Sequence, residues 1–314
     1  MSLEVLVCPA DLSDAPVLAE IMELSDKHFN PKAPAVGVLE AEEVLTGYSL
    51  KILARKVVSL KDNQVLAIVT VHPDLSRNRI YADTWHRPNS YSSDQNLLEE
   101  MTLQITMNLA KSVDKEFELW IGTNSLDSKY ISELKSRGFS LLRTYWGLIS
   151  PVGTNPYPTL GSDLKVHLIE SDDDIFTWWQ VHQQSFKNHF GFKPREFIEW
   201  KEMVESATGI DKSARWLLFE NNSPIGFVEG TEIKADQNTG YVAGIGVIPS
   251  AQGKGYGEIL LRWIFAYYAA IGRQFIELNV DAGNESGALR LYEKLGMKPK
   301  HSWQHFENKA WANS

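Results

Sequence analysis

The stretch GYVAGIGVIPSAQGKGYGEILL, residues 240–261, decides how the second half of the chain folds. Its first nine residues are apolar or glycine, which predicts a buried strand, and apolar residues then recur at helical spacing over 258–271. Gly253, Gly255 and Gly257 lie at this strand-to-helix junction. The first N–H groups of a helix have no helical partner, and glycine lets an anion approach them. The stretch therefore predicts a phosphate-binding loop.

Three phosphate-binding patterns compete for this loop. A P-loop needs Ser or Thr after its lysine, but Gly255 follows Lys254. A dinucleotide fingerprint needs a third glycine at the position that Glu258 occupies. The pattern Q/R-x-x-G-x-G/A is met in full by Gln252, Gly255 and Gly257. The alternative, a glycine-rich turn without a ligand, would carry an entropic cost without return.

The chain reads as two copies of one α/β unit. The segment SPVGTNPYPTLGSD (150–163) is rich in Pro, Gly and Ser/Thr and predicts a linker. ISELKSRGFSLL (131–142) and LRLYEKLGMKPK (289–300) both resemble a helix end, a glycine stop and a strand. We therefore expect a first domain over 1–149 and a second over 164–314, each with a mixed sheet and helices on both faces.

The strand and loop, together with NESGALRLYEKLGM (284–297), resemble the coenzyme A-binding core of the GNAT superfamily of N-acetyltransferases. The duplication and the segment SFKNHFGFKPREFIEW (185–200) are similar to tandem acetyltransferases of the mycothiol synthase kind. The fold class implied is α/β (α+β), with two tandem GNAT-like domains built on twisted mixed sheets.

The resemblance implies an acetyl-CoA-dependent N-acetyltransferase, in which a primary amine of a small molecule attacks the thioester directly. It places the pyrophosphate on backbone amides of the loop and a thioester-polarising amide near Val247. The cofactor-binding residues that it implies are Ile245, Gly246, Val247, Gln252, Gly253, Lys254, Gly255, Tyr256, Gly257, Glu258 and Asn284. Asn284 is also a candidate helix cap, and Lys254 a candidate solvated surface lysine.

Tyr292 matches the family position of the general acid that protonates the departing thiolate, with a packing role as the alternative. The base is less clear, because Tyr241 stands where related enzymes place a glutamate. Glu229 and Glu232 are the nearest acids on the preceding strand, and alternation along a regular strand lets only one of them face the cleft. We expect Glu229 to be the base, against the alternative of a solvated strand-end glutamate.

The first half carries TWHRPNSYSSDQNLLEE (84–100) in the place of the loop, without a glycine. Leu134 occupies the position that matches Tyr292. We therefore expect the N-terminal domain to be degenerate and catalytically silent, a structural partner that shapes the acceptor cleft; the alternative is a weak cofactor site.

Composition limits which binding partners and which cellular compartment we expect for the protein. The 314 residues carry a net charge of −9 and no basic cluster, which argues against nucleic acid. Cys8 is the single cysteine, so a reducing compartment fits, and the N-terminus lacks the pattern of a signal peptide. No apolar run reaches membrane-spanning length and no His or Cys spacing suggests a metal. We expect a cytoplasmic protein without membrane or metal, as a monomer or homodimer.

Two other functional classes remain open at this stage. A non-catalytic acyl-CoA sensor or interaction module would keep the loop without the chemistry, and the missing strand glutamate favours it. A nicotinamide-dependent oxidoreductase is the weaker alternative, because a meander of strands precedes the loop where a dinucleotide fold would begin a βαβ unit.

Overall fold

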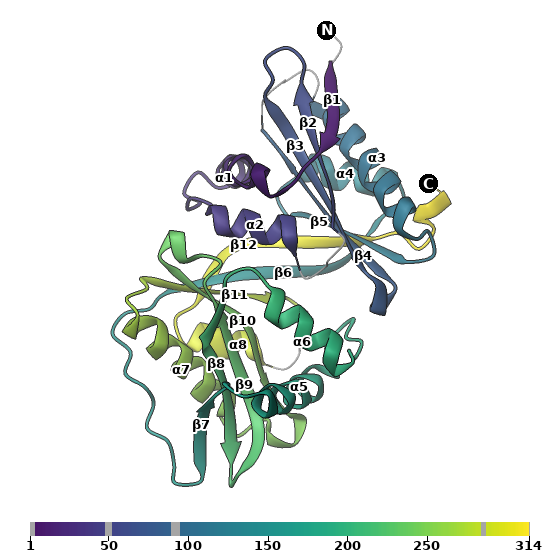
Figure 1. Cartoon of the computed structure of the whole chain (residues 1–314). Coiled ribbons are helices and arrows are strands. Elements are labelled where there is room, and N and C mark those ends of the chain that lie inside the picture. The colour runs from purple at the N-terminus through teal and green to yellow at the C-terminus, as the bar shows by residue number, and fades with distance from the viewer. Residues whose placement is uncertain (1–3, 48–51, 89–94, 284–286, 314) are drawn as a thin grey trace. The chain divides into compact units, whose positions relative to one another are not determined.

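The computed structural model describes residues 4–47, 52–88, 95–283 and 287–313 (Figure 1). The chain forms two compact units. Unit 1 comprises Met1–Trp146, Asp281–Gly283 and His301–Ser314, and unit 2 comprises Gly147–Val280 and Asn284–Lys300. The same order of elements occurs twice along the chain: a strand, two helices, three strands, a helix, a strand, a helix and a strand. The duplication expected from the sequence and the α/β fold class are confirmed.

Unit 1 is built on a sheet with strand order β1-β2-β3-β4-β5-β12-β6. Its elements are β1 (Val5–Pro9), α1 (Ala15–Phe29), α2 (Val38–Thr46), β2 (Leu53–Ser59), β3 (Val65–Asp74), β4 (Arg79–His86), α3 (Gln95–Val113), β5 (Glu118–Asn124), α4 (Ser128–Ser136) and β6 (Ser140–Pro151). Helices α3 and α4 pack on one face and α1 and α2 on the other, each over a separate apolar cluster. The sheet is therefore covered on both faces.

The last strand of the chain completes unit 1. Strand β12 (Lys298–Glu307) contributes its residues from His301 onward, and these run antiparallel to β5, with Trp303 opposite Asn124 and Glu307 opposite Trp120. Phe306 and Trp311 enter the same apolar cluster as Tyr130 of α4. The residues that close the core of unit 1 thus lie almost two hundred positions from the strand that they join.

Unit 2 has the strand order β6-β11-β10-β9-β8-β7, with residues 147–151 of β6 beside β11. Its elements are β7 (Leu164–Leu168), α5 (Asp172–Phe186), α6 (Phe197–Ser206), β8 (Ile210–Glu220), β9 (Ser223–Thr231), β10 (Thr239–Val247), α7 (Tyr256–Ala270), β11 (Phe275–Asp281) and α8 (Ala288–Lys294). Strands β7 to β10 pair antiparallel and β10 pairs parallel with β11, so the sheet is mixed.

Helices cover the two faces of the unit 2 sheet in different ways. Helices α5 and α6 pack through Trp178 and Trp200 onto Phe227 of β9. Helix α7 lies on the opposite face (Figure 1), where a Cβ atom at Gly240 would be 2.4 Å from the ring of Tyr268. The absence of a side chain at residue 240 is what lets this aromatic helix approach the strand so closely.

Local backbone geometry repeats between the units as well. Asn78 and Asn238 both adopt a left-handed conformation just before β4 and β10, with φ of 52° and 53°. Gly138 and Gly296 do the same after α4 and α8, with φ of 79° and 84°. Asparagine and glycine adopt positive φ more readily than other residues. The two units therefore use the same residue types at the same turns.

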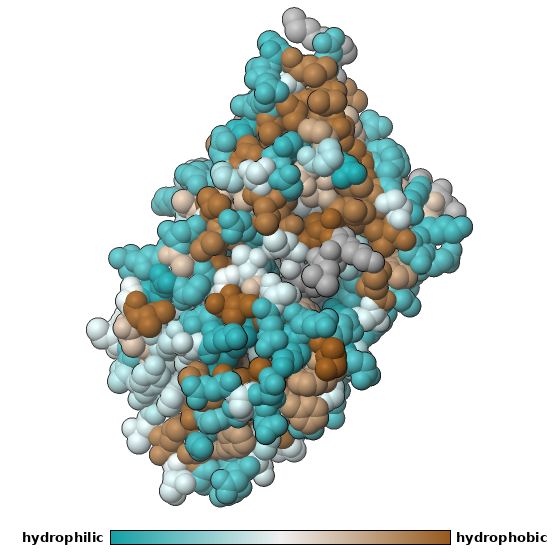
Figure 2. All heavy atoms as spheres, in the orientation of Figure 1, coloured by the Kyte–Doolittle hydropathy of each residue, from teal (hydrophilic) through white to brown (hydrophobic). Residues whose placement is uncertain are grey.

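The surface of unit 1 carries apolar side chains at one end. Leu6 and Val7 on the edge strand β1 and Leu60 after β2 are exposed, and Figure 2 shows hydrophobic residues gathered over this end. None of the helices in the described stretches is both long enough and apolar enough to cross a bilayer.

Candidate functional site

Strand β10 separates from β11 halfway along its length. The parallel pairing runs from Thr239 to Val242, and the register with β9 shifts between Val242 and Gly244. Beyond this bulge β10 continues to Val247 paired with β9 alone. Ala243, in the middle of a six-stranded sheet, is exposed. A bulge bends its strand, so the two parallel strands open into a wedge at this point.

The hydrogen-bonding groups that face this wedge follow from the antiparallel ladder. Ile248 donates its N–H to the carbonyl of Ile225 at 2.9 Å. Hydrogen-bonded and non-hydrogen-bonded pairs alternate along such a ladder, so the N–H and C=O groups of Ile245 and Val247 point away from β9 and into the wedge. The Val247 carbonyl accepts from the side-chain amide of Gln252 at 3.0 Å. Gln252 therefore ties the loop to the strand.

The glycine loop presents bare backbone at the start of α7. Gly253 and Gly255 have φ of 79° and 86°, in the left-handed region, and a Cβ atom on either would meet nothing within 4 Å. In the described part of the chain, the N–H groups of residues 253–257 have no protein acceptor, whereas Glu258 donates to the carbonyl of Gly255 at 3.0 Å. Successive donors at a helix N-terminus are an arrangement suited to an anion, and residues 253–257 are called the cradle below.

Cations surround the cradle, and each is paired with a carboxylate. The Lys254 ammonium lies 3.3 Å from Glu220, to which Tyr256 also donates its hydroxyl. This hydrogen bond to Glu220 raises the pKa of Tyr256 to about 12. Glu258 is bound by Lys294 at 2.6 Å and by Arg262, and hydrogen bonds from these two cations lower its pKa. The positive charges of the three cations around the loop are therefore largely balanced by the two carboxylates.

Tyr292 is buried in α8, beside the start of α7. A Cβ atom at Gly257 would lie 3.3 Å from Leu291, which shows how closely the two helices approach. Burial raises the pKa of Tyr292 to about 12, so its hydroxyl stays protonated at neutral pH. Asn284, expected to contact the cofactor, lies outside the described residues.

Glu229 faces the α5 side of the sheet, directly opposite Gly244 at the bulge. Arg215 donates to its Oε1 atom from Nε at 3.0 Å and from Nη2 at 2.8 Å, and the guanidinium lies 5.0 Å from the ring centre of Trp178. Burial raises the pKa of Glu229, and the Arg215 charge opposes the rise. No donor to Oε2 is found among the described residues, so this oxygen is available to a water or a substrate.

Glu232 lies at the other end of β9. Strands β9 and β10 are antiparallel, so Gly226 is opposite Val247 near the loop, and Thr231 is opposite Tyr241 at the far end. Glu232 follows Thr231 and forms an ion pair with Arg273. The structure thus brings Glu229, and not Glu232, to the part of β10 that is open.

Two residues at the site were not found from the sequence. Arg215 holds Glu229 in place, and Ser185 of α5 lies against Gly246, where a Cβ atom would be 2.7 Å from Cβ of Ser185. The Ser185 hydroxyl is buried and has no hydrogen-bond partner in the described structure. Arg215 stands in no quoted motif, and Ser185 stands in the segment 185–200 with nothing local to mark its role. Only the approach of α5 to the open strand reveals it.

Comparisons with known proteins agree with this geometry. The acetyltransferase (GNAT) family profile matches residues 173–297, which run from α5 through the split strand and the loop to the end of α8. Residues 173–297 thus match the acetyltransferase (GNAT) family.

Two mycothiol acetyltransferases are similar in sequence to part of this chain. A mycothiol acetyltransferase of Streptomyces scabiei is 28% identical over 142 residues, 44% of each chain, and one of Streptomyces griseus is 25% identical over 194 residues, 60% of each chain. The chain thus aligns with about half the length of these curated relatives.

The solved structures show the fold. A GCN5-related N-acetyltransferase from Sphaerobacter thermophilus has a TM-score of 0.78 at 19% identity, covering 98% of this chain and 96% of its own. A tandem GNAT protein from the clavulanic acid biosynthesis pathway has a TM-score of 0.70 at 11% identity, covering 98% and 99%. Both comparisons cover nearly the whole chain, and they confirm the predicted fold of two tandem GNAT-like units.

Tyr241, which stands where related enzymes place a glutamate, lies beside a buried triad of charges. Tyr241 is opposite Glu277 of β11, and Glu277 is held by Lys234 at 2.9 Å and by Lys300 at 2.6 Å. The Lys234 ammonium is 5.8 Å from the centre of the Tyr241 ring. Despite its burial, the attraction of the two lysines lowers the pKa of Glu277 to about 2. Position 241 therefore holds a tyrosine next to fixed structural charges, where related enzymes place a glutamate.

No group of three or more His, Cys, Asp and Glu side chains suited to a metal ion occurs in the described part of the chain. The expectation of a metal-free site remains a prediction.

We expect Glu277→Gln to destabilise the protein by about 3–5 kcal/mol at pH 7, because it leaves two buried ammonium groups without a counter-ion. Glu277 has a folded pKa of about 2 against a usual 4.5, so its contribution is complete above pH 4.5 and is lost as the pH falls towards 2. Urea denaturation between pH 3 and 7 should show that the free energy of unfolding falls less steeply with decreasing pH in the variant than in the parent. Exposed Glu205→Gln, the control, should change stability by no more than about 0.5 kcal/mol; an equal effect of both variants would contradict the assignment.

Proposed function

We propose that unit 2 binds acetyl-CoA and transfers its acetyl group to the primary amine of a small molecule. The observation that carries the proposal is the unbroken run of unpartnered N–H groups at residues 253–257, next to a strand whose open edge also faces the wedge. A diphosphate satisfies the first set of donors and an extended amide-containing chain satisfies the second. The names of the mycothiol acetyltransferase relatives support the same chemistry.

Within this proposal, the loop amides bind the pyrophosphate, and the pantetheine lies along β10 as an added strand. Ile245 and Val247 direct their N–H groups into the wedge, so either one can donate to the thioester carbonyl oxygen as negative charge develops there. Gln252 keeps the Val247 carbonyl occupied and fixes the turn between strand and loop. The thioester supplies an activated acetyl group.

The proton transfers are assigned to two buried side chains. Glu229 accepts a proton from the substrate ammonium through a water molecule, which leaves a neutral amine to attack the carbonyl carbon. The C–N bond forms, the C–S bond breaks, and Tyr292 donates its proton to the departing thiolate. The second proton, which the nitrogen loses as the amide forms, returns through water to the Tyr292 phenolate. With its pKa near 12, Tyr292 needs direct contact with the sulfur to do so.

A non-catalytic acyl-CoA sensor is the second candidate function. Two observations favour it: Tyr241 stands in the family's glutamate position, and Arg215 engages one oxygen of Glu229. The two functions separate in one assay, because a sensor binds coenzyme A without releasing thiol from acetyl-CoA when amines are added.

Gly255→Val should abolish coenzyme A binding. Valine at φ of 86° is strained, and its side chain would fill the space in which an anion approaches the amides. Isothermal titration calorimetry should show at least a roughly 100-fold weaker affinity, equivalent to about 2.7 kcal/mol. Gly272→Val is the matched control, because Gly272 at the other end of α7 has φ of 81° and equally open surroundings. If both variants bind coenzyme A like the parent, the proposal that the amides of residues 253–257 bind the pyrophosphate is wrong.

Tyr292→Phe should lower kcat by about 100-fold while coenzyme A affinity stays within about two-fold, since only the proton donor is removed. Release of free thiol from acetyl-CoA, measured over a panel of amines, gives the rate. Tyr157→Phe, on the half-exposed tyrosine that contacts Trp263, is the matched control. Unchanged turnover in Tyr292→Phe would remove the acid from the mechanism.

Glu229→Gln should also lower kcat by about 100-fold and should remove the acidic limb of the kcat/KM profile, because the base no longer titrates. The limb in the parent should lie above pH 4.5, since burial raises the pKa of Glu229. Glu232→Gln should cost less activity, because Glu232 is paired with Arg273 at the far end of β9. The reverse order of the two effects would exclude Glu229 as the base.

A further inference from the structure

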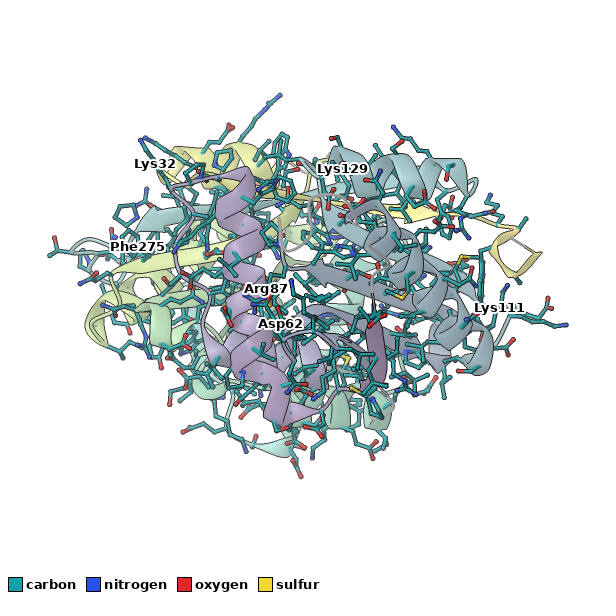
Figure 3. All side chains as sticks on the ribbon, turned by 90° about the horizontal axis from the view of Figure 1, so that it is seen from above. Lys32, Asp62, Arg87, Lys111, Lys129 and Phe275 are labelled. Atoms are coloured by element: carbon teal, nitrogen blue, oxygen red, sulfur yellow. The ribbon has the colours of Figure 1, made fainter. Side chains whose placement is uncertain are left out.

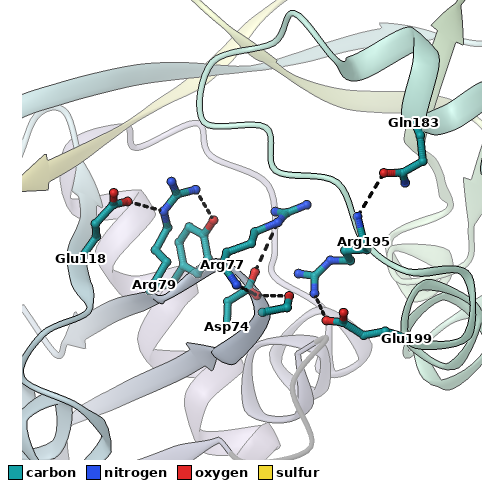
Figure 4. Close-up of polar contacts among 9 residues, drawn as sticks. Asp74, Arg77, Arg79, Glu118, Gln183, Arg195 and Glu199 are labelled. Carbon is teal, nitrogen blue, oxygen red and sulfur yellow. Dashed lines mark hydrogen bonds and ion pairs between the residues drawn. The ribbon is translucent and has the colours of Figure 1, made fainter.

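The ion pair between Arg215 and Glu229 lies inside unit 2. The two residues are directly opposite each other on β8 and β9, and Arg215 is only 5% exposed. Three other arginines of the chain pair with acids whose side chains are 42% to 57% exposed: Arg79 with Glu118 and Arg195 with Glu199 (Figure 4), and Arg87 (Figure 3) with Glu20. Removing a guanidinium from water is costly, so a buried one needs several partners.

Three elements hold the guanidinium of Arg215. Its Nε and Nη2 atoms donate to Oε1 of Glu229 on β9 at 3.0 and 2.8 Å. Nη2 also donates at 2.8 Å to the carbonyl of Val204. Val204 lies in the last turn of α6, where a helix leaves its carbonyls without helical partners. The ring centre of Trp178 on α5 is 5.0 Å from the guanidinium carbon, within the range of a cation–π contact.

This arrangement determines which oxygen of Glu229 can take up a proton. Both hydrogen bonds from Arg215 end on Oε1, and no described residue donates to Oε2. Oε2 is also the atom beside the open strand, because a Cβ atom at Gly244, at the bulge of β10, would lie 3.8 Å from it. The Glu229 side chain keeps 14% of its surface accessible. Oε2 is therefore the oxygen that a water molecule can approach.

Arg215 also supplies the charge that acts on this carboxylate. Burial raises the pKa of Glu229, and the attraction and hydrogen bond of Arg215 oppose the rise. Among the described residues, Arg215 alone acts on this pKa besides burial. The other titratable or charged groups on the surrounding elements, which make no contribution, are His182 on α5, Lys201 and Glu205 on α6, Asp211 on β8, Glu232 after β9 and Tyr241 on β10.

We propose that Arg215 is a positioning residue for the proton transfer, which turns Oε2 of Glu229 towards the open part of β10 and keeps the carboxylate charged at neutral pH. The substrate ammonium loses one proton through water, Oε2 gains it, and the guanidinium keeps its charge throughout. The planar donors of arginine reach Oε1 and the Val204 carbonyl in fixed directions, which a single ammonium cannot do. This inference rests on the proposed function, since it concerns the same proton.

The pH profile of kcat/KM for thiol release from acetyl-CoA separates this role from a merely structural one. Arg215→Met should move the acidic limb upwards by about one pH unit or more, because loss of the positive charge favours the protonated form of Glu229. Arg215→Lys should keep the limb within about 0.5 pH unit of the parent but lower kcat on the plateau about ten-fold, since the carboxylate stays charged but is less well oriented. A limb that stays in place in Arg215→Met would overturn the proposal.

Arg273 offers a matched control. It pairs with Glu232 and donates to the carbonyl of Ala235 at 3.3 Å, so it also joins one acid to one backbone carbonyl. Arg273→Met should leave the acidic limb in place, because Glu232 lies at the far end of β9. An equal displacement of the limb in Arg273→Met and Arg215→Met would reveal a general effect of the lost charge and would contradict the role of Arg215.

A double variant tests whether Arg215 acts through Glu229. In the Glu229→Gln background, Arg215→Lys should lower kcat by no more than about two-fold, since the group that it orients is already gone. A further loss of about ten-fold would place the effect of Arg215 elsewhere and refute the inference. If circular dichroism shows that Arg215→Met does not fold, this comparison and the plateau of Arg215→Lys decide the question.

A titration without substrate separates failure of this inference from failure of the proposed function. In protein isotope-labelled at its glutamate carboxyl carbons, the NMR signal of Glu229 is the one that Glu229→Gln lacks. This signal should titrate about one pH unit or more higher in Arg215→Met than in the parent. If it does so but the parent releases no thiol with any amine, acetyl transfer fails and the action of Arg215 on Glu229 stands. If the parent releases thiol and neither the signal nor the limb moves, this inference alone fails.

Discussion

Backbone hydrogen-bonding groups without protein partners are the feature on which the candidate site of unit 2 depends. Buried N–H and C=O groups are nearly always paired. Here β10 leaves β11 after Val242, and α7 begins with N–H donors that no carbonyl of the described residues accepts. The bulge at Gly244 and the left-handed glycines 253 and 255 create this opening. In the proposed function, the surrounding side chains act on the molecule that occupies this opening.

The two units share a plan but not a chemistry. Both begin β4 or β10 after a left-handed asparagine, and both break parallel pairing partway along, after Asp83 in unit 1 and after Val242 in unit 2. Unit 2 follows this break with glycines and a bare helix start. Unit 1 places a buried carboxylate and aromatic rings beside it. Duplication thus preserved the sheet geometry while the exposed chemistry diverged.

Two buried carboxylates of unit 2 differ in the number of cations beside them. Glu277 and Glu229 are both buried beside cations, yet their pKa values shift in opposite directions. Two lysines outweigh the desolvation of Glu277, whereas burial outweighs the single arginine at Glu229. The first is therefore fixed in its charged form, and the second is the better candidate to exchange a proton.

Several features were predictable because their signals are local. Local sequence predicts the loop glycines, the start of α7 and the end of α8 at Gly296. Helix ends and turns depend on the φ values and capping residues of a few neighbours. The repeat of element order was visible for the same reason. The role of Tyr292 rested on a motif resemblance, and its assignment as the acid remains a prediction.

The sequence alone determined the order of the elements in the second half, and it marked a glycine loop between β10 and α7. That this loop binds an anion stays a prediction. Tertiary structure alone decided which carboxylate meets the open strand, that Ser185 lies against Gly246, and that residues from His301 onward complete unit 1. Those outcomes depend on pairing and burial between residues far apart in the chain, and such contacts leave no periodic or local signature.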